Sequence, residues 1–85
     1  MLADHITTAT ELGERYRANR RVLRLTQQEV ADMVGCRRQT IADLEAGKNV
    51  ETYTLIAALC ALGKVLEIVD VRFDADQLAE LFRDE

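Results

Sequence analysis

Arginine and glutamine cluster at the start of one short segment, where the sequence reads RRQT at residues 37–40. Arg and Gln are the side chains that read guanine and adenine edges through paired hydrogen bonds in the major groove of DNA. A second short segment begins at Gln27 and ends at Gly35, and the free N–H groups of a helix start bind phosphate. These residue types favour contact with nucleic acid over chemistry on a substrate.

The chain offers little for catalysis or metal binding. It has one histidine, His5, no serine and no glycine-rich phosphate loop, so neither a hydrolytic triad nor a nucleotide loop is predicted. His5, Cys36 and Cys60 fall in different segments, which is not the spacing of metal ligands. We therefore predict no enzyme, no metal and no cofactor. Both cysteines lie in apolar patterns and are expected to be buried, while the arginines after Cys36 leave a redox role for that thiol open.

Length and charge predict one small domain with two kinds of partner. A chain of 85 residues has a marginal core, and a second subunit is the expected source of extra stability. The net charge of −4 hides an asymmetry, because residues 14–48 carry eight Lys and Arg against five Asp and Glu, whereas residues 49–85 carry three against eight. This polarity suits one anionic partner and one basic partner, although plain solubility explains the acidic tail as well. No apolar run approaches 18 residues, so a protein of the cytoplasm, neither secreted nor membrane-spanning, is expected.

Capping signatures and glycines predict four helices in the first 63 residues. Two Thr-x-x-Glu signatures, at residues 8–11 and 26–29, have the spacing of a capping box. Gly35 and Gly47 follow helix-forming runs, where a left-handed residue ends a helix. The helices are expected at residues 9–23, 27–34, 37 or 38 to 46, and 52–62.

The first and fourth of these helices differ in pattern. The fourth is apolar almost all round and is expected at the centre of the core. On the first, an exposed polar face is the favoured interpretation for the arginines, with a phosphate contact from Arg17 or Arg21 as the alternative. The residues expected on its inward face are Leu12, Tyr16, Val22 and Leu23. The arginines of its polar face are Arg15, Arg17, Arg20, Arg21 and Arg24.

After residue 63 the apolar period changes from 3.6 to 2, which predicts one β-strand over residues 65–73. A lone strand has no partner in its own chain, so pairing with the same strand of a second copy across a two-fold axis is the simplest solution. Asp74 and Gln77 then start a short helix of residues 75–83, which must dock on its own domain, on the dimer mate or on a partner. The dimerisation residues are Val65, Leu66, Ile68, Val69, Val71 and Phe73, and the partner-binding stripe is Leu78, Leu81 and Phe82.

The two short helices around Gly35 have a helix-turn-helix layout, with Val30, Val34, Ile41 and Leu44 as the seam. The run LTQQEVADMVGCRRQTIADLEAGK, residues 25–48, resembles the Cro/CI-type, or XRE, helix-turn-helix family, and the likeness extends over residues 12–62. The resemblance implies an all-α, lambda-repressor-like bundle of four to five helices. It also implies that Arg38, Gln39 and Thr40 face base edges, that Gln27, Lys48 and Asn49 contact the phosphate backbone, and that Arg37 does either.

Asp43 lies beside these residues, and we expect it to pair with a neighbouring cation or to reject a wrong base. A second run, CALGKVLEIV at residues 60–69, resembles the HipB-like antitoxins of type II toxin–antitoxin pairs. That resemblance implies a strand paired across the dimer and a kinase-like, HipA-like toxin bound to the repressor. The acidic helix after the strand departs from the pattern, and this leaves the toxin and the role of the tail open.

We therefore predict a DNA-binding domain over residues 1–63 and a strand-helix extension over residues 64–85. The predicted function is a homodimeric, sequence-specific repressor, an antitoxin that represses its own operon by binding a palindromic operator in the bacterial nucleoid. A stand-alone phage-type repressor is one alternative. A protein-interaction module that has lost DNA binding is the other; the negative net charge favours it, and the outward donors at residues 37–39 oppose it.

Overall fold

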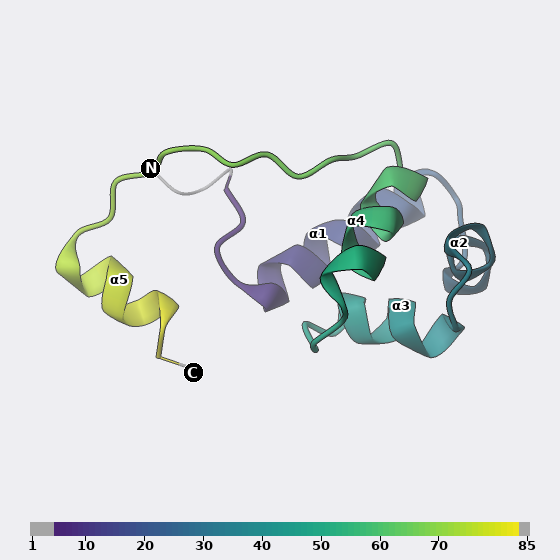
Figure 1. Cartoon of the computed structure of the whole chain (residues 1–85), viewed down its shortest axis with the longest axis horizontal. Coiled ribbons are helices and arrows are strands. Elements are labelled where there is room, and N and C mark those ends of the chain that lie inside the picture. The colour runs from purple at the N-terminus through teal and green to yellow at the C-terminus, as the bar shows by residue number, and fades with distance from the viewer. Residues whose placement is uncertain (1–4, 84–85) are drawn as a thin grey trace.

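The computed structural model describes residues 5–83, which form four packed helices and a fifth that stands apart (Figure 1). Within these residues there are only helices and connecting segments, which confirms the all-helical expectation. The predicted ends of the helices agree with the observed ends to within two residues. The helices are α1 (Ala9–Val22), α2 (Gln27–Val34), α3 (Arg38–Glu45), α4 (Thr52–Ala61) and α5 (Ala75–Leu81).

The core lies where α1, α2, α3 and α4 meet. Helix α2 packs against both α3 and α4, and α1 packs against α3. The predicted seam of the helix-turn-helix is present, because Val30 of α2 and Ile41 of α3 are fully buried. The hydroxyl of Tyr16 donates to the carbonyl oxygen of Ala58 at 2.8 Å, which ties α1 to α4, and burial raises the pKa of Tyr16 to about 12. The buried core residues are Tyr16, Val30, Ala31, Ile41, Leu44, Ala58, Leu59 and Leu62.

Local sequence signals fix the position of α2. The N–H of Glu29 donates to the Thr26 hydroxyl at 3.0 Å, and the N–H of Thr26 donates to the Glu29 carboxylate at 2.9 Å, so the predicted capping box is confirmed. Gly35 ends the helix with φ +84°, a left-handed conformation that glycine adopts without a steric penalty. A defined start and a defined turn together set the path from α2 into α3.

Two expectations about burial are wrong. Val22 and Leu23 are 79% and 49% exposed, because the residue one turn after Tyr16 on the inward face of α1 is Arg20. Cys60 is also exposed, since α4 packs through its face around Leu59 and leaves the opposite face in solvent. An apolar composition all round a helix therefore does not mean that all of its faces are buried.

Residues 65–73 form no strand in the described chain; they run as an extended segment (Figure 1). A strand is defined by backbone hydrogen bonds to a neighbour, and no second strand lies beside this segment within residues 5–83. Of the six predicted dimerisation residues, four are exposed (Val65, Leu66, Ile68 and Val69), and Val71 and Phe73 are half-buried. Pairing with a second copy stays a prediction.

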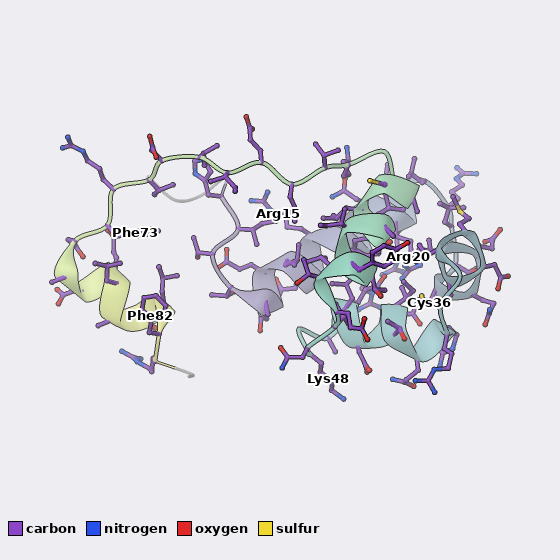
Figure 2. All side chains as sticks on the ribbon, viewed as in Figure 1. Arg15, Arg20, Cys36, Lys48, Phe73 and Phe82 are labelled. Carbon is purple, nitrogen blue, oxygen red and sulfur yellow. The ribbon has the colours of Figure 1, made fainter. Side chains whose placement is uncertain are left out.

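Helix α5 begins with the expected N-cap, since Asp74 and Gln77 form a capping box. None of its residues is buried, and it lies at the opposite end of the molecule from α2 and α3 (Figures 1 and 2). In the predicted partner-binding stripe, Leu78 and Phe82 are exposed and Leu81 is half-buried. Helix α5 therefore does not dock on its own four-helix bundle, which was one of the three docking sites expected for it.

Candidate nucleic-acid interface

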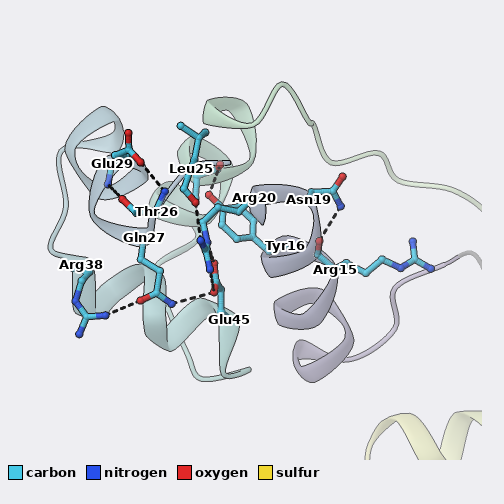
Figure 3. Close-up of polar contacts among 11 residues, drawn as sticks. Arg15, Tyr16, Asn19, Arg20, Leu25, Thr26, Gln27, Glu29, Arg38 and Glu45 are labelled. Carbon is cyan, nitrogen blue, oxygen red and sulfur yellow. Dashed lines mark hydrogen bonds and ion pairs between the residues drawn. The ribbon is translucent and has the colours of Figure 1, made fainter. Parts of the chain in front are cut away.

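The first turns of α2 and α3 bring two of the predicted DNA contacts together. Gln27 is the first residue of α2, and Arg38 is the first residue of α3. The Nη1 atom of Arg38 donates to Oε1 of Gln27 at 2.7 Å (Figure 3). Arg38 is exposed and Gln27 is half-buried, so the pair presents a guanidinium at the surface beside an amide that is held in place.

The next residues of α3 form a second pair. Gln39 is exposed, and its Nε2 atom donates to Oδ1 of Asp43, one helical turn later, at 2.9 Å. Asp43 was expected to pair with a neighbouring cation or to reject a wrong base; its side-chain partner here is the Gln39 amide and not a cation, and the second role stays a prediction. Thr40 lies between them in sequence and is half-buried. The outward face of α3 therefore offers a guanidinium, an amide and a carboxylate, which are the groups that hydrogen-bond to base edges.

The predicted backbone contacts lie at the two ends of α3. Arg37 is the N-cap residue of α3, is exposed, and makes no side-chain cap. Lys48 and Asn49 are exposed in the loop after α3, and the N–H of Lys48 donates to the carbonyl oxygen of Asp43 at 2.9 Å. Figure 2 shows the Lys48 side chain projecting from this loop away from the helices. Cations therefore flank the outward face of α3 at both ends.

A buried ion pair lies beneath this surface. The Nε and Nη2 atoms of Arg20 donate to the two carboxylate oxygens of Glu45 at 2.5 and 3.0 Å, and Nη1 donates to the carbonyl oxygen of Leu25 at 2.7 Å. The side chains of Arg20 and Glu45 are only 10% and 4% exposed. Glu45 also accepts a hydrogen bond from Nε2 of Gln27 at 3.0 Å (Figure 3). The expectation that Arg20 belongs to the exposed polar face of α1 is therefore wrong.

These contacts join four residues, Arg20, Glu45, Gln27 and Arg38, into one chain of hydrogen bonds, which we call the polar relay. Burial alone would raise the pKa of Glu45, but the hydrogen bonds from Arg20 and Gln27 outweigh it and lower that pKa below its ordinary value. A carboxylate only accepts hydrogen bonds, so Gln27 must turn its NH₂ toward Glu45 and its carbonyl oxygen toward Arg38. The relay thus sets the orientation of the Gln27 amide and the position of Arg38.

Arg20 and Glu45 were not among the predicted site residues. They are 25 residues apart, and no short motif connects them. The signal that could have found Arg20 is its spacing of four residues from Tyr16, which places a charged group on the inward face of α1. A charge in that position needs a buried partner, and Glu45 follows the buried Leu44 directly.

Two other features, a metal-ligand cluster and a membrane-spanning helix, are absent from residues 5–83. No group of three or more His, Cys, Asp or Glu in this part of the chain is placed to hold a metal ion. None of the helices described there has both the length and the apolar composition needed to cross a membrane.

Comparison with known proteins places these features in a family. A family model described as helix-turn-helix matches residues 17–67, more than half of the 85 residues, and this range contains α2, α3 and α4. No curated protein matches the chain. The matched range includes the polar relay and all eight predicted DNA contacts, so the chain has the architecture of a sequence-specific DNA-binding regulator. It belongs to the helix-turn-helix family of the Cro/CI, or XRE, type.

Proposed function

We propose that this protein is a homodimeric transcriptional repressor whose helix α3 reads bases in the major groove. The observation that carries the proposal is the exposed donor pair Arg38 and Gln39 on the first turn of α3, with Arg38 held from below by the polar relay. Thr40 and Asp43 lie on the same helix, within reach of the same base edges. A pre-positioned guanidinium loses less conformational freedom on binding, which favours specific over non-specific contact.

The phosphate contacts follow from the same placement. Lys48 and Asn49 are exposed beyond the end of α3, Arg37 is exposed at its start, and Gln27 lies at the start of α2. With α3 in the major groove, these positions lie toward the two phosphate strands that border it. Because phosphate contacts release counterions, affinity is expected to fall steeply with salt.

Replacing either reading residue tests this assignment. Arg38→Ala and Gln39→Ala are each expected to relax base preference by about 1–3 kcal/mol at one position of each half-site, because a bidentate base contact is lost. The measurement is fluorescence anisotropy with the upstream DNA and with duplexes substituted at single positions. Arg83→Ala removes an exposed arginine that lies outside both the reading surface and the predicted strand at residues 65–73, and it should leave base preference unchanged. If the wild-type protein shows no binding even at low salt, the protein-interaction module is the better interpretation.

Dimerisation is the second part of the proposal. We assign residues 1–63 to DNA binding and residues 64–85 to assembly, with residues 65–73 of two copies pairing as antiparallel strands. The extended backbone of this segment and its exposed valine, leucine and isoleucine side chains support the pairing. Two α3 helices about 34 Å apart would then read a palindrome with half-sites one helical turn apart.

A charge in the pairing segment tests the dimer. Val69→Asp is expected to move most of the protein from dimer to monomer, because it places a carboxylate in an apolar interface. Sedimentation velocity over a range of concentrations measures the change. Val22→Asp is the matched control, since Val22 is exposed on α1, outside the segment. A Val69→Asp protein that stays fully dimeric would rule out the assigned strand.

The proposed biological role is that of an antitoxin that represses its own operon in the bacterial nucleoid. The extension supports this role, since α5 carries an apolar stripe of Leu78, Leu81 and Phe82 that the bundle does not cover. A HipA-like kinase toxin is the partner we propose for it. Co-expression with the neighbouring reading frame tests the role, because an antitoxin must relieve the growth arrest that the toxin causes. A protein that represses the operon but gives no relief is a stand-alone repressor.

A further inference from the structure

A groove lies between the last two turns of α1 and the first turn of α2. Its volume is about 590 Å³, and none of its lining residues is Asp or Glu. We call it the arginine groove. It is defined by Arg17, Arg20, Arg21, Arg24, Gln27 and Arg38.

Most of the positive charge in the arginine groove is uncompensated. Arg20 is neutralised by Glu45, and the proximity of Arg17 helps to lower the pKa of that same carboxylate. Arg21 and Arg24 are exposed, and within residues 5–83 neither forms an ion pair. Like charges gathered in one groove repel each other and concentrate anions there. The arginine groove therefore suits a ligand that carries several negative charges in a row.

The arginine groove is continuous with the proposed reading surface. Gln27 and Arg38 line it, and both belong to the polar relay that positions the donors of α3. A polyanion that contacts Gln27 at the start of α2 would continue toward the end of α1, where Arg21 and Arg24 lie. The DNA strand that borders the major groove is such a polyanion, because it carries one charge at every phosphate.

We propose that the arginine groove binds the sugar-phosphate backbone that flanks each operator half-site, through Arg21 and Arg24. This inference rests on the proposed function and extends the DNA contact beyond α2 and α3, along α1. Arg21 and Arg24 increase the affinity for DNA and its dependence on salt, whereas the residues of α3 determine base preference.

The test is the salt dependence of operator binding by Arg21→Gln/Arg24→Gln. Each phosphate contact adds about 0.9 to the slope of log K against log salt, so the double variant is expected to lose about 2 from that slope per bound protomer. Arg24 has φ +59°, a left-handed backbone conformation that glycine would relieve. Glutamine is used at position 24 because it removes the charge without changing stability through the backbone. Arg21→Lys/Arg24→Lys keeps both charges and should keep the slope.

Lys64→Gln/Arg83→Gln is the matched control, since it removes two positive charges that lie outside the arginine groove and outside the pairing segment at residues 65–73. A second measurement uses operator duplexes whose flanking phosphates are replaced by uncharged methylphosphonates. The wild type should bind these duplexes more weakly than the unmodified operator. The Arg21→Gln/Arg24→Gln variant should bind both kinds of duplex with the same affinity. Equal slopes for wild type and variant, or an equal loss in the matched control, would overturn the groove assignment while the repressor proposal stands. A wild type that binds no DNA would overturn both.

Discussion

Replacing Glu45 with alanine is expected to destabilise the protein by about 3–5 kcal/mol, the effect of removing one partner from a buried ion pair. The Arg20 guanidinium would stay in a site where its side chain is 10% exposed, with Leu25 as its remaining acceptor. Small domains have total free energies of unfolding of about 5–15 kcal/mol, so this loss removes a large share of the stability of the protein. Urea denaturation followed by circular dichroism measures the change.

Two further variants separate the charge from the packing. Glu45→Gln keeps one acceptor for Arg20 and should lose less stability than Glu45→Ala. Arg20→Met/Glu45→Leu removes both charges together and is expected to recover most of the loss, because apolar pairs of similar volume replace buried ion pairs well. A Glu45→Ala effect below about 1 kcal/mol, typical of a surface pair, would mean that the ion pair is not buried in solution.

The lowered pKa of Glu45 adds a pH dependence to this variant series. A carboxyl whose pKa is lower in the folded state contributes stability that is fully present above its unfolded pKa, about 4.3, and is lost as the pH falls through the folded value. The wild type should therefore lose stability more steeply than Glu45→Gln as the pH falls below about 4. Urea midpoints between neutral and acidic pH measure the difference between the two proteins.

The parts of the fold that depend on neighbouring residues could be predicted from the sequence. The start of α2 follows from Thr26 and Glu29, and its end follows from Gly35, since capping and left-handed turns are decided within a few residues. The exposure of Gln39 was also predictable, because Ile41 and Leu44 set the inward face of α3 and the helical period places Gln39 on the opposite side.

The parts that depend on tertiary contacts could not be predicted. The pairing of Arg20 with Glu45 and the capture of Gln27 by that pair require the crossing of α1, α2 and α3 in space. The exposure of Cys60 depends on which face of α4 meets the core, and an all-apolar helix carries no pattern that chooses one. Residues 65–73 alternate like a strand, but the backbone that would complete a ladder is not in the described chain.

Replacing Gly13 with alanine is expected to destabilise the protein by about 3 kcal/mol, at the upper end of the range for overpacking a core. In an open helix this change stabilises by about 1 kcal/mol, because alanine is the better helix former. Here a Cβ at Gly13 would lie 2.5 Å from the carbonyl oxygen of Leu44 and 2.6 Å from that of Glu45. Both are backbone atoms of α3, so no side chain can rotate away, and the two helices must separate.

Ala18→Gly is the matched control for this sign reversal, because Ala18 is exposed on the same helix. It should lose about 1 kcal/mol through helix propensity alone, so that alanine is preferred at position 18 and glycine at position 13. The separation of α1 from α3 would also stretch the contact between Arg20 and Glu45, since Glu45 provides one of the crowded oxygens. The urea denaturation midpoints of the wild type, Gly13→Ala and Ala18→Gly measure these changes in stability. A Gly13→Ala protein more stable than the wild type would show that α1 does not approach α3 this closely and would remove the structural basis of the polar relay.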